Sequence, residues 1–304
     1  MELSLFKGIR ATLRQLVSYP IDSWRVKKFR RDIQFLSNEL VCSRLRDEGY
    51  SLARFGDGEL RWMLGDNSVP SFQDGSPALS AALLQAFNVE SSRLLIALPR
   101  AIISDGDLCF KARAFWRHTV ASMGSELFNL IDDKRSYADC NLTRPYLDFK
   151  DKSRCGERFK LIESIWRKRD VLIVEGAGTR FGVGNGLLDR CRTVRRILCP
   201  CTNAFESIDQ IRTAVVQNVK SGDLVLLCLG PTASVLAVEF SQLGIQAIDI
   251  GHLDVEYEWM QQGARDKQPV PGRSVNEAGT GGYVDDSYST DEYERQIVAK
   301  IEGH

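Results

Sequence analysis

The fold class is decided by one stretch of the sequence, VLIVEGAGTRFGVGN at residues 171–185. An apolar run leads directly into a glycine-rich loop there, which is typical of a buried strand that ends in a loop. Similar apolar runs occur at residues 52–55, 94–98, 196–199, 224–229 and 247–250, with amphipathic windows such as 159–168 and 204–219 between them. This alternation predicts an α/β, Rossmann-like fold with a mostly parallel sheet and helices on both faces.

In such a sheet, ligands bind outside the carboxyl ends of the strands, so the loops there are the first place to look for chemistry. The loop after residues 171–175 is expected to open a helix and to hold phosphates, through Gly176, Gly178, Thr179, Arg180 and Asn185. Its spacing is G-x-G-x-x-x-G, not the G-x-G-x-x-G of dinucleotide-binding loops. The next predicted strand also ends in Cys-Pro-Cys, without the acid that holds an adenosine ribose. These features favour a nucleotide diphosphate over NAD.

A second candidate site follows the predicted strand 52–55. Asp57 and Glu59 lie two residues apart in a glycine-containing loop, so both carboxylates can converge on one point. Such a pair suits Mg²⁺ or Mn²⁺, with phosphate oxygens completing the shell. Arg54 and Gly56 are candidate cofactor-binding residues beside it. The alternative is a polar turn in which Glu59 only starts a helix.

Three further segments carry candidate residues. Thr232 follows the strand 224–229 at a predicted helix start, where it either contacts a bound cofactor or only caps the helix. Arg144, in the mixed aromatic and charged segment 143–152, is a candidate phosphate ligand. After the strand 247–250, His252 is a candidate metal ligand, and a general base is expected among three acids: Asp254, Glu256 and Glu258.

Charge is distributed unevenly along the chain of 304 residues, although 40 basic and 40 acidic residues give a net charge of zero. Without a basic excess, we expect no nucleic-acid partner. Residues 1–31 nevertheless hold eight bases and two acids, and residues 276–304 hold two bases and seven acids. We therefore expect a basic amphipathic extension at residues 1–34, a catalytic domain at 35–277 and an acidic, glycine-started tail at 278–304.

The basic extension has two interpretations, because its apolar residues recur at roughly helical spacing. It docks on an anionic membrane surface, or it packs on the domain with a solvated polar face. No run is long enough for a transmembrane helix, and the first residues lack the apolar core of a signal peptide. The eight cysteines show no metal-binding spacing. We expect a cytoplasmic protein with reduced thiols, in peripheral contact with the inner membrane face if the first interpretation holds.

The motifs also follow a recognisable order: RFGDGE, SFQD, LPR, TRPYLDFKDKS, VEGAGTRFGVGN, CPCTNAF, LGPTAS and GHLDVEYEW. In this order they resemble the GT-D-type bacterial glycosyltransferase family, formerly catalogued as a domain of unknown function, over about residues 35–277. The resemblance implies a Rossmann-like, metal-dependent transferase that uses a UDP-sugar. The family's Asp-x-Glu metal motif falls on Asp57-Gly58-Glu59, and Gly186 stands where the family pattern has an acid.

We therefore expect transfer of a hexose from a UDP-sugar to a hydroxyl of a glycan acceptor on a protein or a lipid. If transfer inverts the anomeric centre, a carboxylate must deprotonate the acceptor hydroxyl, and Glu258 is favoured for this role ahead of Asp254. If transfer retains the configuration, no such base is required. An NAD(P)-dependent oxidoreductase and an inert nucleotide-binding subunit of a glycan-assembly complex are the alternatives. The sequence is also compatible with a homo-oligomer.

Overall fold

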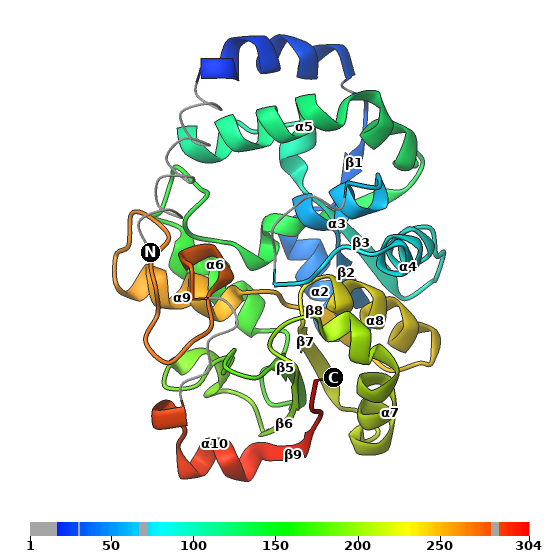
Figure 1. Ribbon diagram of the computed structural model, residues 1–304. Coiled ribbons are helices and arrows are strands. Elements are labelled where there is room, and N and C mark those ends of the chain that lie inside the picture. The colour runs from blue at the N-terminus through cyan, green and yellow to red at the C-terminus, as the bar shows by residue number, and fades with distance from the viewer. Residues whose placement is uncertain (1–16, 30, 67–71, 281–285, 304) are drawn as a thin grey trace.

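The computed structural model of the chain describes residues 17–29, 31–66, 72–280 and 286–303. Within these ranges one parallel sheet of nine strands forms the centre, in the order β1-β4-β3-β2-β8-β7-β5-β6-β9 (Figure 1). The strands are β1 (Gln34–Phe35), β2 (Ser51–Arg54), β3 (Leu94–Leu98), β4 (Ser136–Asp139), β5 (Asp170–Gly176), β6 (Thr193–Cys199), β7 (Leu224–Cys228), β8 (Ala247–Asp249) and β9 (Ile297–Lys300).

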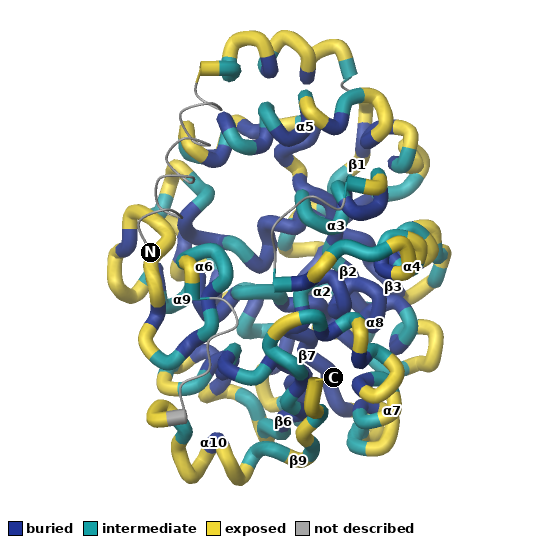
Figure 2. Tube along the Cα trace, in the orientation of Figure 1, coloured by how far each residue is buried: buried dark blue, intermediate teal, exposed yellow. Residues whose placement is uncertain are grey.

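Helices cover both faces of this sheet, as the sequence predicts. On β5, Leu172 and Val174 belong to one apolar cluster, whereas Val171 and Ile173 belong to the other, because successive side chains of a strand point to opposite faces. The first face packs against α3 (Asp57–Met63), α4 (Pro77–Phe87), α5 (Phe110–Leu130), α7 (Ile208–Asn218) and α8 (Pro231–Gln242). The second packs against α2 (Asn38–Asp47), α6 (Cys155–Glu163) and α9 (Leu253–Gln261). Figure 2 shows the buried centre that results.

All six predicted strands are present, with ends that differ from the prediction by three residues or fewer. Strands β1, β4 and β9 were not predicted, because strands at or beside a sheet edge are short or bury only one face and lack a continuous apolar run. Strand β9 comes from the predicted acidic tail. Strand β9 pairs with β6 at the edge of the sheet, directly after α10 (Asp291–Gln296). The boundary at residue 277 stays a prediction.

The glycine-rich loop after β5 corrects one expectation, because it opens no α-helix. It runs through turns to a single 3-10 turn, Gly186–Leu188, and then enters β6. At Gly182 the backbone has a φ of +70°, and a side chain would overlap Leu188. A hydrogen bond fixes the loop to the end of β5: the Glu175 carboxylate accepts from the Phe181 amide at 2.6 Å. The chain therefore turns back to β6 and offers no helix end to a phosphate at this position.

Residues 17–29 form a helix that lies along α5 (Figure 1). Polar contacts join the two: Asp22 pairs with His118 at 3.0 Å, and Arg117 donates to Ser23 at 2.7 Å. Most of the predicted apolar stripe falls in residues 1–16, which lie outside the described residues. Of the helices that the structure describes, none combines the length and the apolar character that a membrane span needs.

Candidate active site

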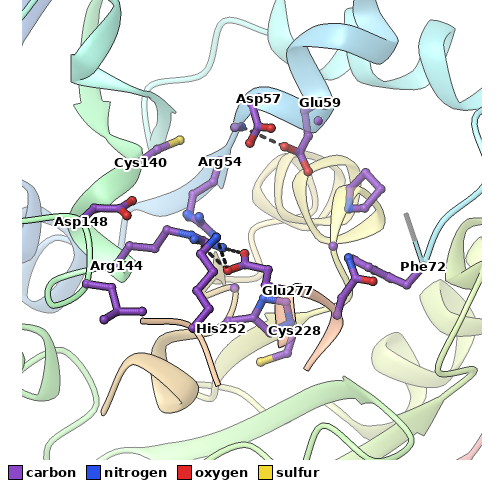
Figure 3. A pocket seen from close by; sticks show the side chains of 18 of the residues that line it. Arg54, Asp57, Glu59, Phe72, Cys140, Arg144, Asp148, Cys228, His252 and Glu277 are labelled. Atoms are coloured by element: carbon purple, nitrogen blue, oxygen red, sulfur yellow. Dashed lines mark hydrogen bonds and ion pairs between the residues drawn. The ribbon is translucent and has the colours of Figure 1, made fainter. Parts of the chain in front are cut away.

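A cavity of about 620 Å³ opens at the carboxyl ends of the strands (Figure 3). Its lining includes Arg54 from the end of β2, Gly176 from β5, Cys228 from β7 and Asp249 from β8. Strands β6 and β7 lie on opposite sides of β5, so the connections of the sheet change direction there. Ligands of open parallel sheets bind at such a point. The cavity is therefore the candidate active site, at the sheet edge that the sequence indicates.

The N-termini of four α-helices converge on this cavity. The N-cap residues of α3, α5, α8 and α9 all line it: Gly56, Cys109, Gly230 and His252. Helix N-termini present free N–H groups and the positive end of the helix dipole, so they favour an anion. Thr232 takes no part in this: it is fully buried behind the α8 terminus and does not reach the lining. Its expected contact with a bound cofactor is not supported.

The predicted carboxylate pair lines the cavity. Asp57 is the first residue of α3, and its carboxylate points into the cavity without a hydrogen bond or ion pair to any residue that the structure describes (Figure 3). Glu59 turns back to accept from the Gly56 amide at 2.9 Å, so it also caps α3. Burial, with Asp249 and Asp57 nearby, raises the pKa of Glu59 to about 7. The structure therefore confirms that Glu59 starts the helix, and metal binding by the pair stays a prediction.

These two carboxylates fit a divalent cation only in part. Mg²⁺ is usually held by one or two carboxylates together with substrate phosphates and water, and Asp57 and Glu59 can supply that number. In the described ranges, however, no group of three or more His, Cys, Asp or Glu side chains is arranged to hold a metal. The predicted set of Asp57, Glu59 and His252 is thus not assembled. His252 lies at the start of α9, among cations.

Cationic side chains gather opposite the carboxylates. Arg54 pairs with Asp249 at 3.3 Å, and Glu277 pairs with Arg144 and with Lys267, the latter at 2.8 Å (Figure 3). Burial, followed by the charge of Arg144, lowers the pKa of Lys267 to about 8. Burial and these same cations lower the pKa of His252 to about 3, so its imidazole is neutral at physiological pH. These cationic side chains can donate charge-assisted hydrogen bonds to a phosphate group.

The predicted phosphate loop contributes less than expected. Gly176 and Thr179 line the cavity, but Gly178, Arg180 and Asn185 do not. Arg180 is buried and donates to the Gly272 carbonyl at 2.8 Å. Asn185 caps the turn at Leu187 and donates to Glu258 at 2.7 Å. Because no α-helix follows β5, the second half of the loop packs against α9 instead of facing a ligand. Gly186, the departure from the family pattern, also lies off the cavity lining.

The three acids expected to include a base have structural partners. Asp254 is fully buried and pairs with Arg273 at 2.7 Å, and Glu258 accepts from the same guanidinium at 3.2 Å. Glu256 accepts from the Tyr146 and Leu147 amides at 3.0 and 2.9 Å. None of the three lines the cavity, and a base must come within hydrogen-bond reach of its substrate. The geometry therefore does not support them as the base.

Several lining residues were missed by sequence reasoning. Asp148 is half-exposed, and within the part of the chain that the structure describes its carboxylate has no hydrogen-bond or ion-pair partner. It belongs to the TRPYLDFKDKS motif, but spacing alone cannot separate it from the neighbouring acid and bases. The first two turns of α5 add an aromatic wall, Phe115 and Trp116, whose rings lie 5.3 Å apart. Nothing in the sequence distinguishes these rings from core residues.

Comparisons with known proteins agree with this architecture. The family described as "Glycosyltransferase GT-D fold" matches residues 52–278. A solved structure described as a domain of unknown function 1792 with a distinct glycosyltransferase fold is similar with a TM-score of 0.84 and 33% identity, over 92% of this chain and all of that one. A new glycosyltransferase of the same domain type from Streptococcus sanguinis is similar with a TM-score of 0.80 and 34% identity, over 89% of this chain and all of that one.

Curated relatives are similar in sequence. "Glycosyltransferase GlyD" of Streptococcus pneumoniae serotype 4 is 34% identical over 95% of this chain and 34% of its own length. "Probable glycosyl transferase Gly" of Streptococcus gordonii is 36% identical over 89% of this chain and 39% of its own length. The chain thus spans little more than a third of the length of these relatives. From the family match and the shared fold, the chain belongs to the GT-D family of glycosyltransferases.

Proposed function

We propose that this chain is the catalytic domain of a metal-dependent glycosyltransferase that moves a hexose from a UDP-sugar to a hydroxyl of a glycan acceptor. One observation carries the proposal. A free carboxylate, Asp57, and a cluster of cations, Arg54, Arg144 and Lys267, line one cavity on which the N-termini of α5, α8 and α9 converge. A metal–diphosphate complex requires a carboxylate for the metal and cationic side chains for the phosphates, close together, whereas an uncharged ligand requires neither.

In this proposal the cavity residues bind and orient the donor. Asp57 and Glu59 would hold Mn²⁺ or Mg²⁺, which when bound neutralises charge on the leaving diphosphate. Arg54, Arg144 and Lys267 donate to phosphate oxygens and hold the diphosphate in place. Since Glu277 already pairs with Arg144 and Lys267, the donor has to share these cations with it. The sugar carbon can then pass through an oxocarbenium-like transition state.

Asp148 replaces the acids of α9 as the proposed base, if transfer inverts the anomeric centre. Its carboxylate lies on the cavity lining, as that of Asp57 does, and has no hydrogen-bond or ion-pair partner among the described residues (Figure 3). A general base has to reach the acceptor hydroxyl directly or through one water. Asp254, Glu256 and Glu258 lie behind the lining and cannot do so without displacing it.

The aromatic wall supports a sugar as the acceptor. Phe115 and Trp116 line the part of the cavity formed by α5, and the Lys111–Asp266 ion pair, 2.8 Å long, lies at its exposed rim. Aromatic rings pack against the apolar faces of sugar rings, while charged rim groups accept and donate hydrogen bonds to hydroxyls. All eight cysteines lie in the described residues and none forms a disulfide there, and five are buried, which supports a reducing cytoplasmic location.

The experiment is calorimetric titration of the protein with UDP, with and without Mn²⁺. Binding should be at least about tenfold tighter with Mn²⁺, and the Asp57→Ala, Glu59→Ala double variant should lose this gain. Asp266→Ala is the matched control, because Asp266 is an acid of the same cavity whose partner is Lys111 at the exposed rim. Equal Mn²⁺ dependence in the double variant would refute the metal site.

A screen of nucleotide-sugars for slow hydrolysis tests the activity itself. UDP-hexoses should be hydrolysed in the presence of Mn²⁺, and other nucleotide-sugars should not. Absence of any hydrolysis, with metal-linked UDP binding intact, would instead favour the inert nucleotide-binding subunit. Binding of NAD(P) in place of UDP would favour the oxidoreductase.

A further inference from the structure

The helix of residues 17–29 is docked through a side that is both polar and apolar: Val26 is buried in the core, and Phe29 stacks on Phe128 of α5. Asp22 is 4% exposed and pairs with His118 on α5, and Ser23 accepts from Arg117. Tyr19 also lies under the Arg117 guanidinium, 4.7 Å from it. These contacts fix how the helix is rotated against α5. They leave the opposite side of the helix uncovered by the described part of the chain.

That opposite side is apolar. Val17, Ile21 and Trp24 are 80%, 59% and 58% exposed, and their i, i+4, i+7 spacing places them on one stripe of the helix. Figure 2 shows the exposed outer side of this helix at the periphery of the molecule. An ordinary surface helix turns its apolar stripe to the core. Here Val26 and Phe29 already face the core, and the additional stripe faces away from it, which indicates a partner that is itself apolar.

Bases flank the apolar stripe. Arg25, Lys27 and Lys28 are exposed, and the Lys28 ammonium lies 3.6 Å from the centre of the Trp24 ring. The acid of this helix, Asp22, is turned inward and paired, so the outer side carries only positive charge. Two copies of this face would repel each other, which argues against a dimer through it. An anionic surface with an apolar layer beneath it complements both the bases and the apolar stripe.

We propose that the stripe Val17, Ile21 and Trp24, with Arg25, Lys27 and Lys28, binds the surface of an anionic lipid bilayer. The apolar side chains insert at the level of the headgroups, where Trp is favoured, and the bases contact lipid phosphates. The helix lies in the membrane plane and holds the catalytic domain at the surface. The inference is independent of the proposed reaction, because no residue of this stripe lines the cavity.

The experiment is flotation of the full chain with phosphatidylcholine vesicles that contain or lack phosphatidylglycerol. We expect binding to the anionic vesicles, weakened by salt. Each Lys or Arg near an anionic surface is worth about fivefold in partitioning, so Lys27→Glu with Lys28→Glu should lower it by at least about 25-fold. Ile21→Ser with Trp24→Ser should also abolish flotation. Leu243→Ser is the control, since Leu243 is 60% exposed at the end of α8, outside the proposed stripe.

Fluorescence provides a second measurement. The other four tryptophans are at most 6% exposed, whereas Trp24 is 58% exposed, so brominated lipids should quench Trp24 selectively. Quenching that is lost in Trp24→Phe supports insertion of this side chain. Equal flotation of all variants, or no flotation with anionic vesicles at low salt, would overturn the proposal. So would a dimer that forms through this face, seen by ultracentrifugation and broken by the serine variants.

Discussion

Replacing Arg196 with Met should destabilise the protein strongly, because Arg196 and Glu175 form a buried ion pair beneath the glycine-rich loop. Their side chains are 2% and 0% exposed, and the guanidinium lies 2.7 Å from the carboxylate. Arg196 also donates to the Phe181 carbonyl at 3.0 Å and to Gln296 of α10 at 2.7 Å. The substitution leaves the Glu175 carboxylate buried without its counter-charge.

The size of the effect follows from this burial. Breaking a buried pair from one side costs about 3–5 kcal/mol, since an uncompensated charge stays in the interior. At about 2.1 cal/mol/K per residue, the 304 residues give an unfolding entropy of about 640 cal/mol/K. A loss of about 4 kcal/mol therefore lowers the Tm by about 6 °C. With Glu175→Gln added, part of this loss should be recovered, because a neutral amide can still accept from the Phe181 amide.

Thermal unfolding followed by circular dichroism measures the shift. The matched control is Arg192→Met, because Arg192 pairs with Asp170 at 2.6 Å but is 64% exposed. Exposed pairs contribute about 0–1 kcal/mol, so the Tm of this variant should change by less than about 2 °C. If the two variants shift the Tm equally, burial is not what makes the Arg196–Glu175 pair important, and the reasoning fails.

Three further predictions concern the cavity. UDP affinity should fall about tenfold from about pH 7 to about pH 9, because the pKa of Lys267 is about 8 and the ammonium group loses its charge above that value. This fall in affinity should be absent in Lys267→Gln. Phe115→Ala should raise the KM for a saccharide acceptor about tenfold, because Phe115 lines the cavity, and should leave hydrolysis of the donor unchanged. The control is Phe110→Ala, which should change neither value, because Phe110 is an exposed ring of the same helix outside the cavity lining. Gly251→Ala should weaken UDP binding and lower stability by about 1–3 kcal/mol, since Gly251 has a φ of +55° and a side chain there would displace Arg54; an unchanged calorimetric titration would contradict this.

The strands that the sequence predicts are those of the sheet interior. Strands β3 and β7 are buried along their whole length, so every residue has to be apolar, and the runs are visible without any contact information. Strand β9 alternates between half-buried and exposed residues, and its place beside β6 depends on a segment about 100 residues away. Such pairings are set by the packing of the domain and leave little trace in the local sequence.

For the site, the sequence by itself determined the edge of the sheet and placed Asp57 and Glu59 there, because parallel strands bring their carboxyl ends to one side. Metal binding by this pair stays a prediction. Only the tertiary structure decided which other polar residues face the cavity. Arg180 and Asp254 lie after strands and Arg54 ends one, but only the first two turn into buried contacts, with Gly272 and Arg273. A buried charge must find a partner wherever the fold supplies one, so its direction depends on residues distant in the sequence.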